Sequence, residues 1–173
     1  MSTMVPCNYF DGQDTLRYGI PWIVPESIHW LDLNLTKKMH AVEFGCGGST
    51  VFLAERCATV FSMDNNQSWV GDVDVELRKR GLYNGTVEYQ PDFESMINAF
   101  NRNYDVAFID CCDISRYDLC KHMSTRAKIV VVDNYAADYV GATDDFFDEH
   151  WQILCYNDLH WQGKGTKIYR RVS

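Results

Sequence analysis

The sequence predicts an α/β fold in which a mostly parallel, seven-stranded sheet is doubly wound by helices and closed by a C-terminal antiparallel hairpin. Three observations predict it. Short β-branched, apolar runs alternate with helical patterns along the chain, which is typical of βαβ units. A glycine-rich turn at residues 45–48 joins the first run to a helical stretch. Gly163 and Gly165 separate the last two runs, as expected for a hairpin loop.

Length and composition favour one domain. The chain has 173 residues, of which 46% are hydrophobic, so it can bury one good core and hardly two. Residues 1–24 contain Pro6, Gly12, Gly19 and Pro21 among aromatic residues, a pattern of turns and not of regular structure. We therefore expect an N-terminal arm over residues 1–24, and a single domain over residues 25–173.

The net charge restricts the binding partners that the sequence predicts, and the cysteine content restricts the cellular compartment. The net charge of −8 disfavours nucleic acid, because binding to a phosphate backbone depends on clustered Lys and Arg. The seven cysteines include no CxxC pair, and no apolar signal segment begins the chain, so we expect reduced thiols and a cytoplasmic protein. No run is long enough to cross a bilayer. The exposed aromatic arm favours a possible homo-oligomer.

The elements follow the hydrophobic pattern. A packing helix is expected to begin at Pro25, where Ile28, Leu31 and Leu35 recur at helical spacing. Asn65 is expected to cap a helix that ends near Gly81. The nearly continuous apolar run before Asp110 fits a central strand that is buried on both faces. The seven strands are expected at residues 41–44, 59–63, 86–89, 104–109, 128–132, 151–156 and 166–171.

The glycine turn predicts a cofactor seat, and its sequence indicates which cofactor. The third glycine or alanine of the dinucleotide fingerprint is replaced by Thr50, and the turn lacks the lysine of a phosphate-binding loop. An acid, Glu43, stands two residues before Gly45. A carboxylate at this place would repel a pyrophosphate and suit a cationic ammonium group. The alternative is a glycine turn that merely joins strand to helix.

This acidic-x-Gly-x-Gly pattern resembles the first motif of class I S-adenosylmethionine-dependent methyltransferases, which have a Rossmann-like fold closed by an antiparallel hairpin. Asp64 lies about 20 residues beyond the glycines, where a carboxylate meets a ribose diol. In the resembling family, the junction at Asp92 and Phe93 lies against the adenine, although Asp92 equally suits a helix cap. The residues expected to bind the cofactor are Glu43, Gly45, Cys46, Gly47, Ser49, Thr50, Asp64, Asn65, Asp92, Phe93 and Asp110.

Oxygen ligands follow two further strands. Asp110, Asp133 and Asn134 resemble the set with which cation-dependent small-molecule O-methyltransferases hold Mg²⁺, and Asp110 is our candidate catalytic residue. That family places a lysine where this chain has Asp113. Asp133 and Asn134 also suit a turn in which they bond to their own backbone.

We therefore expect an S-adenosylmethionine-dependent methyltransferase that acts on oxygen of a small molecule or sugar. Residues 110–113, Asp-Cys-Cys-Asp, lack the Asn/Asp-Pro-Pro-Tyr/Phe motif of many base-methylating enzymes, which also argues against a nucleic-acid acceptor. Two alternatives remain: a non-catalytic, regulatory protein that binds the same cofactor, and an enzyme that uses the cofactor in another reaction, such as cleavage of the sulfonium.

Overall fold

The computed structural model describes residues 15–99, 102–112, 114–135, 143–156 and 165–172. Within them, seven strands form one sheet in the order β3-β2-β1-β4-β5-β7-β6. Neighbouring strands are parallel, except that β7 runs antiparallel to both β5 and β6. This confirms the predicted fold class. The strands are β1 (His40–Phe44), β2 (Thr59–Asp64), β3 (Gly85–Tyr89), β4 (Val106–Ile109), β5 (Ile129–Asp133), β6 (Trp151–Tyr156) and β7 (Thr166–Arg171).

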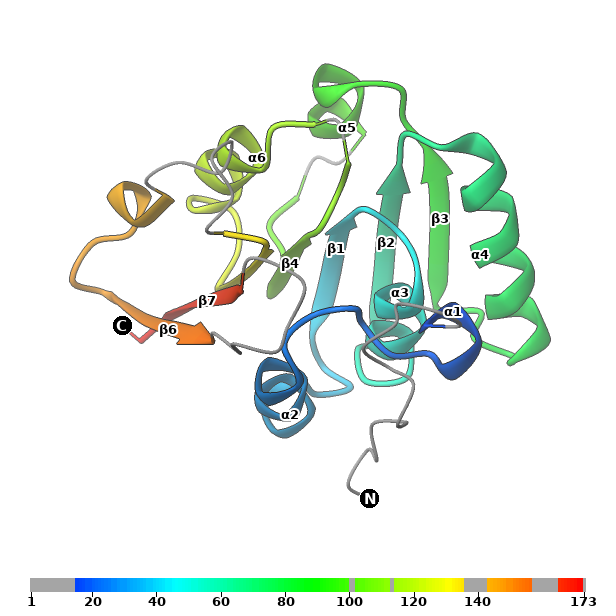
Figure 1. Cartoon of the computed structure of the whole chain (residues 1–173), viewed down its shortest axis with the longest axis horizontal. Helices are drawn as coiled ribbons and strands as arrows, with labels where there is room; N and C mark the ends of the chain where they lie inside the picture. Colours follow the sequence, from blue (N-terminus) through cyan, green and yellow to red (C-terminus); the bar gives the residue numbers. More distant parts are fainter. Residues whose placement is uncertain (1–14, 100–101, 113, 136–142, 157–164, 173) are drawn as a thin grey trace.

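Helices cover both faces of the sheet (Figure 1). Buried residues of α2, α3 and α4 form a core on one face, and those of α5 and α6 form a second core on the other. None of the described helices is long and apolar enough to cross a membrane. The helices are α1 (Thr15–Tyr18), α2 (Pro25–Asn34), α3 (Gly48–Ala54), α4 (Gln67–Lys79), α5 (Phe93–Asn98), α6 (Arg116–Met123) and the 3₁₀ helix η2 (Thr143–Phe146).

Strand alternation decides which side chains of β1 face which core. Val42 and Phe44 lie in the core beside α5 and α6, whereas Ala41 lies in the core beside α3. Glu43 shares the face of Ala41, because successive side chains of a strand point to opposite faces. Its neighbour on β2 is Ser62. The acid of the glycine motif is thus directed toward α3.

The segment before α2 packs more closely than the sequence predicts. Ile20, Ile23 and Val24 are buried, and the N–H of Val24 donates to the hydroxyl of Thr166 at 3.2 Å. The prediction of turns alone over residues 1–24 was wrong where α1 forms. Residues 20–24 contribute to the domain core, and the boundary at residue 24 stays a prediction. The predictions that concern residues 1–14, Asp113 and Gly163 lie outside the described residues.

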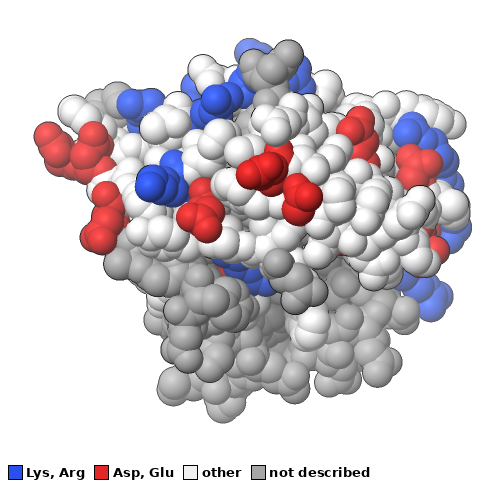
Figure 2. All heavy atoms as spheres, turned by 90° about the horizontal axis from the view of Figure 1, so that it is seen from above, with Lys and Arg blue, Asp and Glu red and all other residues white. Residues whose placement is uncertain are grey.

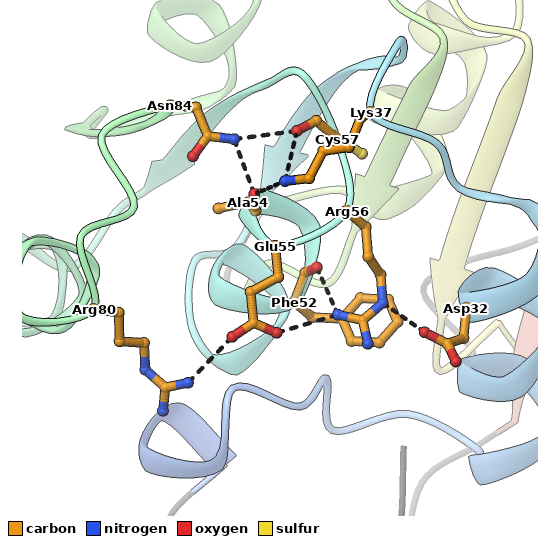
Figure 3. A network of polar contacts seen from close by, with 9 residues as sticks. All are labelled: Asp32, Lys37, Phe52, Ala54, Glu55, Arg56, Cys57, Arg80 and Asn84. Carbon is orange, nitrogen blue, oxygen red and sulfur yellow. Dashed lines mark hydrogen bonds and ion pairs between the residues drawn. The ribbon is translucent and has the colours of Figure 1, made fainter. Parts of the chain in front are cut away.

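Helix α3 is held at its C-terminal end by side chains from two other parts of the chain (Figure 3). The amide of Asn84 donates to the carbonyl oxygens of Ala54 and Cys57 at 2.9 and 3.1 Å. The ammonium group of Lys37 donates to the same two oxygens at 3.1 and 3.5 Å. These donors satisfy carbonyl groups that the end of a helix leaves without partners.

Arg56, just beyond α3, connects this end to α2. Its Nε donates to Asp32 at 2.7 Å, and its guanidinium lies 3.6 Å from the ring centroid of Phe52. Glu55 contacts Arg80 of the next helical segment at 3.4 Å. The network in Figure 3 fixes α3 from three directions, so that its other end is held firmly at the carboxyl edge of the sheet.

Replacing Asn84 with Ala should lower the free energy of unfolding by about 1–2 kcal/mol, because two half-buried hydrogen bonds to helix carbonyls are lost. Urea unfolding followed by circular dichroism measures this. Asn98→Ala is the matched control: Asn98 is exposed at the end of α5, and its loss should change stability by less than about 0.5 kcal/mol. Equal stability of the two variants would contradict the role given to Asn84.

Candidate active site

A cavity of about 630 Å³ opens at the carboxyl ends of the parallel strands. It lies at the point where the chain, having added β2 and β3 on one side of β1, continues with β4 on the other side. Open α/β sheets bind ligands at such switch points. Of the residues predicted to bind a cofactor, those that line the cavity are Gly45, Cys46, Gly47, Ser49, Asp64, Asn65 and Asp110.

The glycine turn fits between two other segments of the chain. Gly45 has φ of 97°, and a Cβ atom there would lie 2.5 Å from the carbonyl oxygen of Asp110. A Cβ atom on Gly48 would lie 2.5 Å from the carbonyl oxygen of Thr15 and would also meet Ile20. The turn can therefore lie against the end of β4 and beneath the N-terminal segment only because these positions carry no side chain.

Glu43 stabilises the glycine turn through hydrogen bonds on the side that faces α3. Its Oε2 accepts hydrogen bonds from the hydroxyls of Thr50 and Ser62, both at 2.5 Å. The Thr50 hydroxyl in turn accepts from the N–H of Gly47 at 2.9 Å. A chain of hydrogen bonds therefore connects β1 and β2 to the first turn of α3 and to the backbone of the glycine turn.

The Glu43 carboxyl is fully buried, and this burial raises its pKa to about 7, against the opposing effect of the nearby hydroxyl groups of Ser49, Ser62 and Thr50. Among the described residues, no group completes a hydrogen bond to its Oε1. Glu43 and Thr50 do not line the cavity. Strand alternation directs the Glu43 carboxyl toward α3 and not into the cavity, so its expected contact with an ammonium group stays an untested prediction that this geometry does not favour.

Asp64, at the end of β2, lines the cavity beside the turn. Its Oδ2 accepts from the N–H of Cys46 at 3.0 Å, and its Oδ1 accepts from the N–H of Asn66 at 2.8 Å. Both bonds fix the carboxylate without using all of its lone pairs. The cap of α4 is Asn66, whose side chain accepts from the N–H of Trp69, and not Asn65, which lines the cavity.

Sequence reasoning missed three aromatic residues of the cavity wall: Trp22, Trp69 and Tyr89. The indole N–H of Trp69 donates to the carbonyl oxygen of Cys46 at 2.6 Å, which supports the turn from α4. Tyr89 is the last residue of β3 and is 42% exposed. One indication in the sequence favoured a place for Tyr89 in the cavity wall, namely its position at the end of a predicted strand.

Asp92 and Phe93 do not line the cavity. The Asp92 carboxylate accepts from the N–H of Ser95 at 2.8 Å and caps α5, which is the alternative that the sequence left open. Phe93 is half-buried and packs against the core beside α5 and α6. A contact of either side chain with an adenine would require a ligand that extends beyond this cavity.

Asp110 lines the cavity at the end of β4, and a buried arginine holds it there. The guanidinium of Arg116 lies 3.0 Å from the Asp110 carboxylate. Burial, followed by the charge of Asp133, raises the pKa of Asp110 above its ordinary value. Burial raises the pKa of Asp133 to about 6. Sequence reasoning missed Arg116, since a charged residue seven positions beyond the end of β4 carries no pattern of its own.

The predicted metal ligands are near one another, but their oxygens have other partners. The Asp133 carboxylate accepts from the Thr166 hydroxyl and from the Asn134 amide, both at 2.8 Å. Asn134 has a positive φ of 54°, as in the turn that the sequence allowed as an alternative. The described residues include no cluster of three or more His, Cys, Asp or Glu arranged to hold a metal ion. The guanidinium of Arg116, 3.0 Å from the Asp110 carboxylate, places a positive charge beside these oxygens, and this charge disfavours Mg²⁺ there.

Solved structures share this architecture. A candidate methyltransferase from Streptococcus mutans, in complex with S-adenosylhomocysteine, matches with a TM-score of 0.64 and 16% identity, over 82% of this chain and 93% of that one. A candidate O-methyltransferase from Klebsiella pneumoniae matches with a TM-score of 0.68 and 14% identity, over 97% and 91%. The chain has the fold of class I methyltransferases.

An rRNA methylase from Streptococcus thermophilus has the same fold, with a TM-score of 0.66 and 17% identity over 84% of this chain and 96% of that one. No protein-family model and no curated protein matches the sequence. At these identities the likeness establishes the methyltransferase fold, and the activity has to be argued from the site itself.

Replacing Glu43 with Gln should remove a pH-dependent loss of stability. The folded-state pKa of about 7 lies above the ordinary value, so between the two values the folded protein binds more protons than the unfolded chain. Stability from this group is present at low pH and is lost as the pH rises through about 7. The unfolding free energy of the wild type should fall, relative to Glu43→Gln, by about 2 kcal/mol between about pH 5 and pH 8.

Urea titrations at both pH values test this, with Glu94→Gln, an exposed acid on α5, as the matched control. The control should follow the wild type at both pH values. Parallel pH profiles for the wild type and Glu43→Gln would contradict the raised pKa.

Replacing Gly45 with Ala should destabilise the protein by about 3 kcal/mol or more, because the new Cβ atom meets backbone atoms after β4 at a positive φ. Gly71→Ala is the opposite case. Gly71 lies within α4 with no atom within 4 Å of an added Cβ, so this change should stabilise by about 0.5–1 kcal/mol. Thermal melts compare the two, and a Gly45→Ala protein as stable as the wild type would show that the turn is not packed as described.

Proposed function

We propose that the protein is a methyltransferase that uses S-adenosylmethionine bound in the cavity at the carboxyl edge of the sheet. One observation carries this proposal: the backbone of the glycine turn and the carboxylate of Asp64 open on the same cavity, at the switch point of the sheet. A volume of about 630 Å³ is within the range of small-molecule sites.

Asp64 is the group that recognises the ribose in this proposal. A carboxylate accepts hydrogen bonds from two adjacent hydroxyls, and bonds to a charged acceptor are the stronger kind. The N–H groups of Cys46 and Asn66 already fix the orientation of Asp64, so little freedom is lost on binding. Tyr89, on the neighbouring strand, presents a ring against which a base can stack.

When bound, the cofactor would supply a methyl group on a sulfonium, so that an acceptor oxygen can bond to the methyl carbon while the C–S bond breaks and S-adenosylhomocysteine leaves. The protein has to hold the acceptor in the correct orientation and remove its proton. Asp110 is the candidate base, because it lines the cavity and burial raises its pKa. A raised pKa makes a carboxylate a better proton acceptor near neutral pH.

A small molecule or sugar remains the proposed acceptor. Figure 2 views the edge of the sheet toward which β1, β2 and β3 point, and acidic and basic side chains are interspersed over the described part of that face. Nucleic-acid binding favours a clustered basic surface instead. The RNA methylase among the structural neighbours keeps an RNA acceptor as the competing candidate. A cytoplasmic location and a homo-oligomer remain proposals from the sequence.

A second candidate function is binding of the same cofactor without methyl transfer. The observation that favours it is the ion pair between Asp110 and Arg116, because this pair engages the proposed base. Mass spectrometry of the products from labelled S-adenosylmethionine, offered with a panel of hydroxylated acceptors, separates methyl transfer from cleavage of the sulfonium and from binding alone.

Calorimetry with S-adenosylhomocysteine tests the proposed cofactor. The wild type should bind, and Asp64→Ala should weaken binding by about 1–3 kcal/mol, the loss expected when hydrogen bonds to a charged group are removed. Asp72→Ala is the matched control, because Asp72 is an exposed acid on α4 and should leave affinity unchanged. Absence of binding to the wild type would reject the proposal.

A further inference from the structure

Arg116 is a buried guanidinium fixed by the ends of two neighbouring strands. It is the first residue of α6 and is 4% exposed. Its Nε donates to the carbonyl oxygen of Cys111 at 3.0 Å, and its Nη1 donates to the carbonyl oxygen of Asp133 at 2.7 Å. Its Nη2 lies 3.0 Å from Oδ1 of Asp110. Three nitrogens of one side chain thus join the end of β4 to the end of β5.

A divalent cation shared by these strand ends would need the same oxygens. One oxygen of Asp110 faces the guanidinium, and both carboxylate oxygens of Asp133 accept hydrogen bonds, from Thr166 and Asn134. Mg²⁺ requires near-octahedral oxygen ligands at about 2.0–2.1 Å. A cation bound here would lie beside the Arg116 guanidinium, and the two positive charges would repel each other in a largely buried place.

We propose that Arg116 takes the place of a divalent cation in this site. Its guanidinium holds the carboxylate of Asp110 at the cavity, offsets the adjacent charge of Asp133, and supplies the positive charge that a metal ion would otherwise supply between the two strand ends. In this account Arg116 is a positioning residue, since it acts on the cavity through Asp110. The consequence for catalysis rests on the proposed function: methyl transfer should proceed without added metal.

The wild-type protein provides the first test, because it requires no substitution. Mn²⁺, a paramagnetic substitute for Mg²⁺, is titrated into the protein with and without S-adenosylhomocysteine, and free Mn²⁺ is measured by electron paramagnetic resonance. We expect no saturable site below about 1 mM. A single site of micromolar affinity that is lost in Asp133→Asn would overturn the proposal.

Arg116→Gln provides the second test. Without the guanidinium, the two acids lose the positive charge that lies beside them, so affinity for Mn²⁺ should rise by about tenfold or more. Lys121→Gln removes one positive charge from the exposed face of the same helix and should leave Mn²⁺ affinity unchanged. A folded Arg116→Gln protein with unchanged Mn²⁺ affinity would also overturn the proposal.

The metal readout is independent of the proposed activity. Calorimetry with S-adenosylhomocysteine reports on cofactor binding alone, so that failure of the methyltransferase proposal leaves the Mn²⁺ result interpretable. If the cofactor binds and methyl transfer occurs, excess EDTA should leave the rate unchanged. Loss of activity in EDTA that is restored by Mg²⁺ would show that a metal is required despite Arg116.

Discussion

The carboxyl of Glu43 is removed from water between β1 and α3, and the arrangement of the glycine turn depends on how that burial is compensated. Thr50 and Ser62 donate hydrogen bonds to one of its oxygens. The Thr50 hydroxyl also accepts a hydrogen bond from the N–H of Gly47. A buried carboxyl is costly unless it is hydrogen-bonded or protonated, and its pKa of about 7 reflects both effects. Glu43 therefore stabilises the glycine turn from the side that faces α3 and not from the cavity.

The same edge of the sheet illustrates how the rest of the fold supports the site. The network at the C-terminal end of α3 holds that helix, while Gly45 and Gly48 let the turn lie against the end of β4 and the N-terminal segment. Asp64 then reaches the cavity already oriented by backbone N–H groups. Such preorganisation is the property that a binding site needs most, because it lowers the cost of ordering on binding.

The elements were predictable because strong local patterns dictate them. The run expected at residues 128–132 is β5, and the turn at Gly45 lies at a strand end as its motif indicates. The direction of Glu43 was also present in the alternation of β1, but the negative charge of its side chain suggested a contact with a cationic ligand group instead. Arg116 and Trp22 were not predictable, because their positions in the site depend on how α6 and the N-terminal segment pack in three dimensions. Hydrophobic periodicity predicts that a helix or strand forms, but it does not predict where that element packs in the fold.

In the proposed complex, the glycine turn and Asp64 bind the methyl donor, while Glu43 makes no contact with it. A crystal structure of the protein soaked with S-adenosylhomocysteine tests this most directly. We expect ligand density in the cavity, with the ribose hydroxyls hydrogen-bonded to Asp64 and with Glu43 still hydrogen-bonded to Thr50 and Ser62. Density in which the amino group of the ligand contacts the Glu43 carboxylate, or a ligand bound away from the glycine turn, would contradict it.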